Sequence, residues 1–227
     1  MKRTLIVAGG MLRPAFLRSF MENCPPDEII AADRGLDALA EAGTRMPDLL
    51  VGDFDSTRLD PEKLRDRIGG VERYPKEKDF SDLESALHAA ITRGSSEITV
   101  LGATGGRLDH FLAAVMGLLI PLEAGIPARI VDEQNVIRLA GHSFSVKKEK
   151  SRGTYLSLIP LTQEVRHVTL RGFYYDGEDL TLTQRKASYG ISNEIIAEEA
   201  YVEFQEGILI VVESADGDNG DRPHCHH

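Results

Sequence analysis

Short apolar runs alternate with helix-like segments over the first two thirds of the chain. The apolar runs are TLIVAGG (residues 4–10), EIIAAD (28–33), DLLVGD (48–53), EITVLG (97–102) and ARIVD (128–132). The helix-like segments between them are AFLRSFMEN (15–23), GLDALAEAG (35–43), DFSDLESALHAAITRG (79–94) and LDHFLAAVMGLLIPLEAG (108–125). Strands that are apolar throughout and separated by helices predict an α/β fold, with a parallel sheet covered by helices on both faces.

The pattern changes after about residue 140. The segments HSFSVKK (142–148), TYLSLIPL (154–161), RHVTLRGF (166–173), DLTLTQ (179–184), AYVEFQEG (200–207) and ILIVVES (208–214) are short and mostly alternate apolar with polar residues. They predict a smaller antiparallel all-β sandwich domain. We expect the boundary within about five residues of Gly141. Residues 1–140 would then form the α/β domain, residues 141–215 the all-β domain, and residues 216–227 a disordered tail.

Composition narrows the class of protein. The 227 residues include 26 basic and 36 acidic ones, a formal net charge of -10, which argues against a nucleic acid partner. The longest apolar stretch, residues 111–122, is too short to span a bilayer, and the N-terminus lacks the apolar core of a signal peptide. Only Cys24 and Cys225 are present, so a disulfide scaffold is excluded. We expect a cytoplasmic protein with no membrane partner.

Unusual polar and glycine clusters all follow predicted strands. They are Gly9–Gly10, the run Asp33–Arg34–Gly35, residues 52–56 and residues 102–110. In an open parallel sheet, ligands bind outside the carboxyl ends of the strands. Solubility alone would scatter charge over both edges, so this one-sided distribution favours a ligand site.

The segment GDFDS places two carboxylates at positions i and i+2. On extended backbone Asp53 and Asp55 would point the same way and share one hard cation, with Phe54 on the opposite side. The alternative is a turn with exposed carboxylates. The segment ADRG has a similar alternative, in which Asp33 only caps the following helix.

The segment KEKDFSDLE (76–84) contains a capping box, Ser81-x-x-Glu84, which predicts the start of a helix. The capping box does not account for Asp79 and Asp82, which we expect near Asp53 and Asp55. Lys76 or Lys78 would meet phosphate oxygens.

The segment GATGGRLDH (102–110) combines a glycine loop with Arg107 and Asp109 at a helix start. Glycines let backbone N–H groups approach an anion, and arginine offers a fork of donors that fits phosphate. The alternative is that Asp109 caps the helix and pairs with Arg107. The clusters together indicate metal-assisted phosphoryl or nucleotidyl chemistry. A Walker-type phosphate loop is absent.

The motifs ADRG, GDFDS, KDFSDLE, GATGGRLDH and a late GISN (190–193) resemble those of thiamine pyrophosphokinases in order and approximate spacing, from about residue 4 to 213. The family commonly has threonine where this chain has Ser81, and the hydroxyl is retained. The resemblance implies transfer of the diphosphate of ATP to the hydroxyethyl oxygen of thiamine, giving thiamine diphosphate and AMP. It also implies a homodimer with shared active sites, in which thiamine lies between the α/β domain of one chain and the β domain of the other.

The resemblance also implies roles for individual residues. Mg²⁺ would be held by Asp53, Asp55 and Asp82, and the catalytic residues would be Asp55, Asp109 and Arg107. The ATP-binding residues would be Gly9, Gly10, Asp33, Arg34, Gly35, Lys78, Asp79, Ser81, Thr104, Gly105, Gly106 and Arg107. Thiamine would be bound by Asp53, Ser192, Asn193 and Tyr175. From their local context alone, Ser192 and Asn193 indicate a turn, and Tyr175 indicates strand packing.

Two other functions fit part of the pattern. A pyrophosphokinase for another alcohol, such as a pterin, would keep the metal and ATP site and change the acceptor. A non-catalytic nucleotide sensor would bind ATP without turnover, but it has little use for four clustered aspartates.

Overall fold

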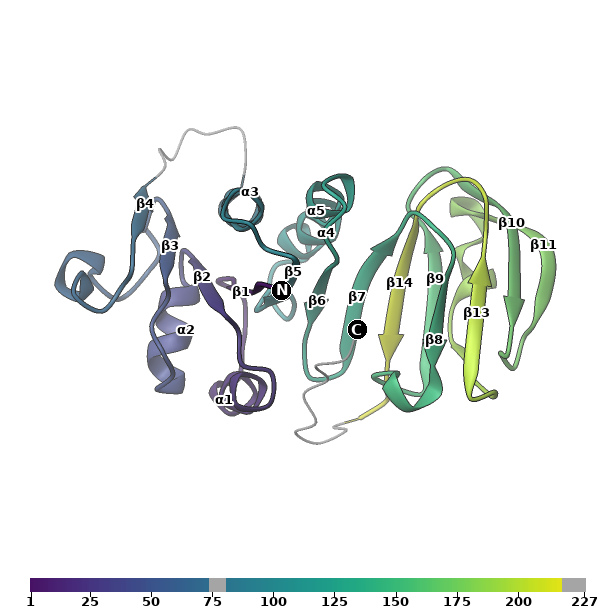
Figure 1. Ribbon diagram of the computed structural model, residues 1–227, viewed down its shortest axis with the longest axis horizontal. Coiled ribbons are helices and arrows are strands. Elements are labelled where there is room, and N and C mark those ends of the chain that lie inside the picture. Colours follow the sequence, from purple (N-terminus) through teal and green to yellow (C-terminus); the bar gives the residue numbers. More distant parts are fainter. Residues whose placement is uncertain (74–80, 218–227) are drawn as a thin grey trace. The chain divides into compact units, whose positions relative to one another are not determined.

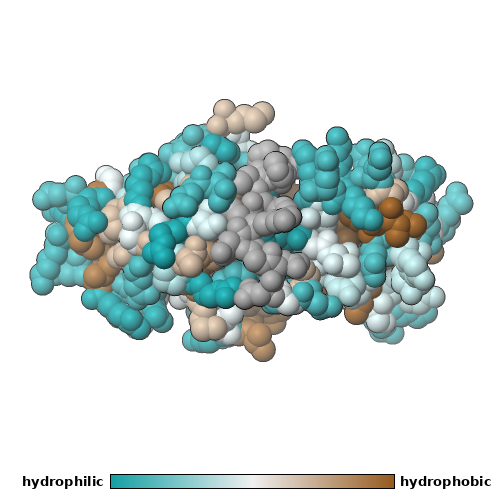
Figure 2. Space-filling view, turned by 90° about the horizontal axis from the view of Figure 1, so that it is seen from below, coloured by the Kyte–Doolittle hydropathy of each residue, from teal (hydrophilic) through white to brown (hydrophobic). Residues whose placement is uncertain are grey.

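The computed structural model describes residues 1–73 and 81–217. Within that range the chain divides into two compact units, residues 1–132 and residues from Glu133 onward, and each unit is described by itself. No helix among the described residues has the length and apolar character needed to cross a membrane. Hydrophilic residues predominate on the molecular face drawn in Figure 2, where hydrophobic ones are scattered in small groups.

The first unit is a parallel sheet with helices on both faces. Its strands are β1 (Arg3–Val7), β2 (Glu28–Ala32), β3 (Leu49–Gly52), β4 (Val71–Arg73), β5 (Glu97–Leu101) and β6 (Ala128–Val131). Its helices are α1 (Pro14–Asn23), α2 (Gly35–Ala42), α3 (Asp82–Thr92), α4 (Leu108–Gly117) and α5 (Leu119–Glu123), with a 3₁₀ helix η1 (Pro61–Leu64). Helices α1 and α2 cover one face, and α3, α4 and α5 cover the other (Figure 1).

Strand order locates the expected ligand edge of this sheet. The order is β6-β5-β1-β2-β3-β4, and every neighbouring pair is parallel. The chain runs from β1 outward to β4 and then returns to the other side of β1 as β5. The point where the direction reverses therefore lies between β1 and β5, and ligands bind at the carboxyl edge of such a point.

Local signals account for most helix ends. The predicted capping box at Ser81 is confirmed: its hydroxyl accepts the Glu84 N–H and its own N–H donates to the Glu84 carboxylate. The helix predicted over residues 108–125 is instead two helices, α4 and α5, joined at Leu118. Pro121 explains the break, because it lacks an N–H and its ring clashes with the carbonyl four residues earlier, that of Gly117.

The second unit consists of two antiparallel sheets. Its strands are β7 (Asn135–Ala140), β8 (Phe144–Lys147), β9 (Tyr155–Pro160), β10 (Glu164–Arg171), β11 (Gly177–Thr183), β12 (Asn193–Glu194), β13 (Glu199–Glu203) and β14 (Leu209–Ser214), with 3₁₀ helices η2 (Lys148–Lys150) and η3 (Gln184–Gly190). The orders are β12-β9-β14-β7 and β11-β10-β13-β8. Both sheets contribute to one buried apolar cluster, so they form a sandwich.

The predicted fold class, a parallel α/β sheet followed by a smaller antiparallel all-β part, is confirmed. The compact units divide earlier than Gly141, because β7 pairs along its whole length with β14 of the second unit. Strand β7 of the second unit and strand β4 of the first unit were not predicted from the sequence. Of the predicted tail, Asp216 and Gly217 are described, and residues 218–227 lie outside the described range.

Candidate active site

Three backbone loops meet closely at the carboxyl edge of the first sheet. The Gly10 N–H donates to the Gly102 carbonyl at 2.8 Å. A Cβ at Gly10 would lie 2.4 Å from that carbonyl oxygen, and a Cβ at Gly35 would lie 1.9 Å from the carbonyl oxygen of Val7. Gly102 has φ of +72° and its added Cβ would lie 2.6 Å from the carbonyl oxygen of Ala8. The loops after β1, β2 and β5 therefore fit together only with glycine at these positions.

The other predicted phosphate-side residues lie on the same loops. A Cβ at Gly9 would be 3.1 Å from the Cβ of Arg34, and one at Gly10 would be 3.0 Å from the carbonyl oxygen of Thr104. Gly105 has φ of +73°. Among the described residues, and apart from Gly106 and its two chain neighbours, no heavy atom lies within 4 Å of the Cβ position of Gly106, so that part of the loop is open. Lys76, Lys78 and Asp79 fall outside the described residues.

Asp33 follows β2 and faces the loop after β3. Its N–H donates to the Val51 carbonyl at 2.9 Å, and its Oδ2 accepts the hydroxyl of Ser56. Its Oδ1 is buried and has no hydrogen-bond partner among the described residues. Burial raises the pKa of the Asp33 carboxyl, and the negative charges of Asp82 and Asp53 raise it further. Two loop carboxylates, Asp33 and Asp53, and that of Asp82 at the start of α3 thus interact electrostatically.

The alternative role for Asp33, a cap on helix α2, is wrong. The cap position is occupied by Arg34, whose side chain makes no capping bond. The carboxylate of Asp33 instead accepts the hydroxyl of Ser56, on the loop after β3.

The prediction of an extended backbone is wrong at Phe54. Phe54 has φ of +64°, which turns its ring into the protein, where the ring is buried and lies 5.3 Å from the Arg73 guanidinium carbon. The Asp53 Oδ1 accepts the Asp55 N–H at 3.1 Å, so Asp53 closes a tight turn. This turn corresponds to the alternative considered from the sequence. The turn engages one carboxylate oxygen of Asp53, Oδ1, in this hydrogen bond, so the turn does not exclude a cation site.

Sequence reasoning missed Asp37, which holds the same loop from helix α2. The side chain of Asp37 is buried, and its carboxylate accepts the Thr57 hydroxyl at 2.8 Å and the Arg58 N–H at 3.1 and 3.2 Å. The signal was present: Asp37 lies between Leu36 and Leu39, on the apolar side of an amphipathic helix. A carboxylate there must find hydrogen-bond donors.

Arg107 and Asp109 form a two-point ion pair at the start of α4. Arg107 Nε lies 3.1 Å from Asp109 Oδ1, and Nη2 lies 2.5 Å from Oδ2. The hydrogen bond from Arg107 is the main reason that the pKa of Asp109 is lowered to about 2, and the pKa of Arg107 is raised by the same contact. The pairing considered as an alternative from the sequence is confirmed. The capping is not, because Arg107 occupies the cap position.

In the second unit, Asn193 fixes the backbone of Tyr175. The Asn193 Oδ1 accepts the N–H groups of Tyr175 and Glu194, both at 3.0 Å, and its Nδ2 donates to the Tyr175 carbonyl at 2.9 Å. Asn193 is buried, whereas the ring of Tyr175 is exposed and meets the ring of Tyr174 edge-on at a centroid distance of 4.8 Å. The amide thus presents a tyrosine pair to the exterior.

Ser192, next in the same motif, has φ of +56°, an unusual value for serine. Its N–H donates to the buried hydroxyl of Ser157 at 3.0 Å, while its own side chain is exposed. Ser192 lies in a bend, in line with the predicted turn, but Asn193 begins strand β12 and so is not part of a turn. The bend leaves the Ser192 side chain on the surface.

Both units match models of one family. Residues 20–130 match "Thiamin pyrophosphokinase, catalytic domain", and residues 141–209 match "Thiamin pyrophosphokinase, vitamin B1 binding domain". The thiamine pyrophosphokinase of Bacillus subtilis is 33% identical over 189 residues, which cover 82% of this chain and 87% of that protein. The chain belongs to the thiamine pyrophosphokinase family.

Solved structures of thiamine pyrophosphokinases support the same assignment. The Bacillus subtilis structure has a TM-score of 0.82 and 30% sequence identity, and the match covers 95% of this chain and all (100%) of that chain. The structure from Geobacillus thermodenitrificans has a TM-score of 0.77 and 34% identity, covering 95% and 98% of the two chains. The protein is thus a transferase of the thiamine pyrophosphokinase class, and a different alcohol acceptor is not favoured.

The acidic side chains at the carboxyl edge of the first sheet are the candidate donors for a metal ion. Within residues 1–73 and 81–217, no group of three His, Cys, Asp or Glu side chains is arranged to hold a metal ion. Asp33, Asp53 and Asp82 nevertheless interact electrostatically, and one Asp33 oxygen is buried without a partner in that part of the chain. Carboxylate oxygens of this kind suit a hard cation. The donors fit Mg²⁺ chemically, and its ligands remain a prediction.

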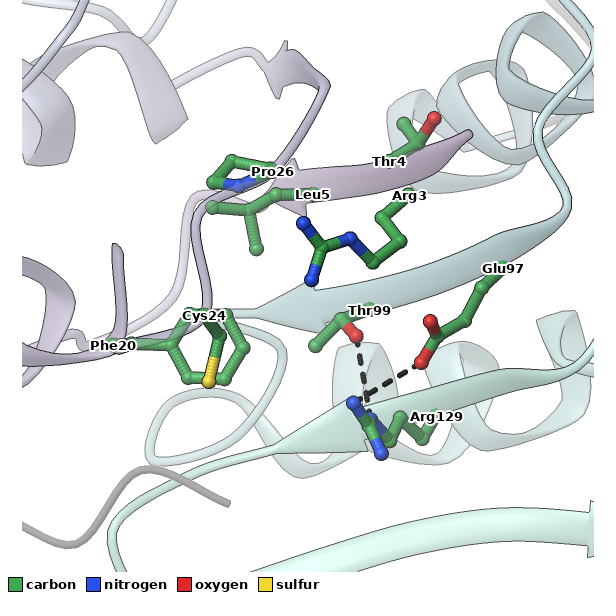
Figure 3. A pocket seen from close by; sticks show the side chains of 9 residues that line it. All are labelled: Arg3, Thr4, Leu5, Phe20, Cys24, Pro26, Glu97, Thr99 and Arg129. Carbon is green, nitrogen blue, oxygen red and sulfur yellow. Dashed lines mark hydrogen bonds and ion pairs between the residues drawn. The ribbon is translucent and has the colours of Figure 1, made fainter. Parts of the chain in front are cut away.

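A separate pocket lies at the opposite edge of the first sheet. It is lined by Arg3, Thr4, Leu5, Phe20, Cys24, Pro26, Glu97, Thr99 and Arg129 (Figure 3). Arg129 Nη2 lies 3.1 Å from Glu97 Oε1, and its Nε donates to the Thr99 hydroxyl at 3.3 Å. Arg3 and Glu97 are the first residues of their strands. The pocket is thus at the amino edge, with Arg129 paired internally, and it is not the candidate active site.

Proposed function

We propose that the protein transfers the intact diphosphate of ATP to the hydroxyethyl oxygen of thiamine, with Mg²⁺ as its cofactor. The alcohol oxygen forms a bond to the β-phosphorus, and the bond from that phosphorus to the α–β bridging oxygen breaks. AMP leaves with the bridging oxygen, and the alcohol proton passes to a base. The products are thiamine diphosphate and AMP.

One observation carries the cofactor part of the proposal: the buried Oδ1 of Asp33 has no partner among the described residues, although Asp53 and Asp82 add negative charge nearby. A polyphosphate bound at this edge would increase the repulsion, so the site needs a cation. Asp53, Asp55 and Asp82 are the residues proposed to hold it. Bound Mg²⁺ supplies positive charge that neutralises phosphate oxygens.

The phosphates of ATP are proposed to bind at the glycine loops after β1 and β5. The open position of Gly106 and the positive φ of Gly105 support this placement, because backbone N–H groups without side chains in the way can approach an anion. Arg34, on the loop after β2, lies against Gly9 and is proposed to contribute charge. Ser81 is proposed to bind a phosphate oxygen through its hydroxyl hydrogen, because in the capping box the hydroxyl oxygen accepts the Glu84 N–H and the Ser81 N–H donates to the Glu84 carboxylate.

The base is proposed to be Asp55 or Asp109. A carboxyl with a pKa of about 2 takes up a proton poorly, so Asp109 is a weak base while Arg107 holds it. A phosphate oxygen that engages Arg107 would weaken that pair and move the pKa of Asp109 toward its ordinary value. ATP binding would in this way prepare Asp109 for the alcohol.

Thiamine is proposed to bind beside Tyr175 and Ser192, with Asp53 on its alcohol side. The exposed ring of Tyr175 supports this, because an aromatic face attracts the positively charged thiazolium ring. Asn193 is proposed to act mainly by holding Tyr175, since three of its hydrogen bonds are made with the protein backbone.

We propose further that the enzyme is a cytoplasmic homodimer with shared active sites. Leu108, Leu112 and Met116 are 76%, 57% and 48% exposed and lie on one side of helix α4, because they are spaced four residues apart. An exposed apolar stripe of this kind suits a protein interface. Sedimentation should show a dimer, and Leu112→Glu should shift it to monomer. A monomeric native protein would refute the dimer.

The decisive experiment incubates the purified protein with ATP, Mg²⁺ and thiamine and separates the nucleotides by chromatography. We expect one AMP for each thiamine diphosphate. ADP with thiamine monophosphate would refute the proposed reaction, and ATP binding without thiamine-dependent turnover would indicate a nucleotide sensor.

Substitutions test the metal ligands in the same assay. Asp53→Asn and Asp55→Asn should each lower turnover severely while the protein stays folded. Asp66→Asn removes an exposed carboxylate from the same unit and should leave turnover unchanged. Wild-type turnover by either site variant at low Mg²⁺ would show that its carboxylate is not needed to hold the metal.

A further inference from the structure

We infer that Asp37 is a positioning residue that sets the geometry of the acidic loop, defined as residues 53–58. Its carboxylate binds Thr57 and Arg58, at the far end of this loop from Asp53. The inference rests on the proposed function, because it concerns the loop that would hold Mg²⁺. Asp37 is not among the residues that the sequence motifs single out.

Helix α2 gives Asp37 a rigid base. Leu36 and Leu39 on this helix have no exposed surface, and Gly35 at its start packs against the backbone of Val7. Asp37 lies in the first turn, where the free N–H groups of a helix favour a negatively charged side chain. The carboxylate is therefore held in one place.

The far end of the acidic loop depends on this carboxylate. Thr57 donates its hydroxyl to Asp37 at 2.8 Å, and Arg58 donates its backbone N–H to both carboxylate oxygens at 3.1 and 3.2 Å. Ser56, just before them, donates to Asp33. Three consecutive loop residues are thus attached to Asp33, which follows β2, and to Asp37 in α2.

The near end of the loop is fixed independently. Gly52 ends β3, and the buried ring of Phe54 anchors the chain two residues later. Asp55 lies between Phe54 and the attached residues 56–58. Removal of the Asp37 contact would release Thr57 and Arg58 and leave the Ser56–Asp33 bond as the anchor on that side of Asp55. The orientation of the proposed metal ligands would then vary, although no ligand has been removed.

Helix α2 offers a matched control. Glu41, one turn after Asp37, contacts the same loop residue, because its Oε1 lies 3.5 Å from Arg58 Nη1. Both side chains of that ion pair are exposed, so the pair adds little. Glu41→Gln therefore removes an acidic contact to the loop from the same helix without removing a buried acceptor.

The test measures Mg²⁺ dependence and loop protection in Asp37→Asn, Thr57→Val, the double variant and Glu41→Gln. Residues that support metal ligands typically change metal affinity by 10–100-fold, so Asp37→Asn should raise the half-saturating Mg²⁺ concentration by about tenfold or more. Thr57→Val should change it in the same direction by less, and the double variant should match Asp37→Asn within about twofold, since both act through one contact. Glu41→Gln should behave as wild type.

Hydrogen exchange of the peptide that contains residues 53–58 provides a readout without metal or turnover. Exchange should accelerate in Asp37→Asn and Thr57→Val and stay at the wild-type rate in Glu41→Gln. If Asp37→Asn does not fold, Thr57→Val decides the question by the same two measurements. Unchanged loop exchange together with an unchanged half-saturating Mg²⁺ concentration would overturn the positioning role.

The two proposals can fail separately. Wild-type protein that makes no AMP from ATP and thiamine would refute the proposed function, whatever Asp37 does to loop exchange. Active wild-type protein combined with Asp37→Asn that loses only thermal stability, at an unchanged half-saturating Mg²⁺ concentration, would refute the positioning role alone.

Discussion

Replacement of Asn193 by alanine should both destabilise the second unit and weaken thiamine binding. The amide of Asn193 makes three hydrogen bonds, two from its oxygen to the N–H groups of Tyr175 and Glu194 and one from its nitrogen to the Tyr175 carbonyl. Alanine would leave all three backbone groups without this partner. The side chain is only 8% exposed, so water replaces these bonds incompletely.

The expected magnitude follows from these bonds. A neutral hydrogen bond contributes about 1 kcal/mol net, so the loss of three should cost about 2–3 kcal/mol in the free energy of unfolding. The lower end applies if water reaches the Tyr175 backbone, because the ring of that residue is 67% exposed. Urea denaturation followed by circular dichroism measures this difference.

The thiamine KM of Asn193→Ala should rise more than its kcat falls, because Tyr175 would no longer be held in one orientation. Ser192→Ala is the matched control: its backbone bond to Ser157 is retained and its side chain is exposed, so stability should not change. A thiamine effect in Ser192→Ala without loss of stability would indicate direct contact with the substrate. An Asn193→Ala protein with wild-type stability would show that the amide does not hold this loop.

Three further predictions concern the first unit. Asp33→Asn should stabilise the free protein in urea denaturation and lower activity, because it removes a charge whose buried oxygen has no described partner. Gly35→Ala should lower the melting temperature strongly or prevent folding, since its Cβ would meet a strand carbonyl at 1.9 Å, whereas Gly106→Ala should melt as wild type. The pKa of Asp109 is lowered from 3.8 to about 2. The stability that its ionised carboxylate adds is therefore complete above about pH 3.8 and is lost as the pH falls through about 2. NMR titration should show this value, and ATP should raise it if phosphate takes Arg107; an unchanged value with ATP bound would refute that exchange.

Much of the fold follows from local pattern, because strand and helix signals depend on residues close together in sequence. The capping box at Ser81 and the glycine after α2, with φ of +64° at Gly43, needed no tertiary information. Strand β7 was missed because it follows β6 almost at once, and only its pairing with distant β14 assigns it to the second unit. The break at Leu118 was missed because the apolar pattern continues through Pro121.

Motif reasoning placed the candidate residues at one edge of the sheet, where their roles stay predictions, but it did not give their geometry. Motif order identified Asp53, Asp33 and Arg107, but sequence spacing cannot reveal the positive φ of Phe54 that makes GDFDS a turn. The role of Asp37 depends on donors twenty residues away, so no local motif contains it. A buried position for an acidic residue in an amphipathic helix is the general signal that would have found it.

The hydrogen bonds and ion pairs of the acidic residues indicate how an acidic protein would accept the polyphosphate proposed as its substrate. Asp37 is occupied by the loop, and Asp109 is paired with Arg107, so neither presents an uncompensated charge. The Arg107–Asp109 pair is exposed, and exposed ion pairs contribute little to stability, so a phosphate can take Arg107 at small cost. Asp33 differs, because its buried Oδ1 has no hydrogen-bond partner among the described residues. Burial raises the pKa of the Asp33 carboxyl, and the charges of Asp82 and Asp53 raise it further. The charge that remains to be neutralised is therefore concentrated at the edge of the sheet where the cation is proposed to bind.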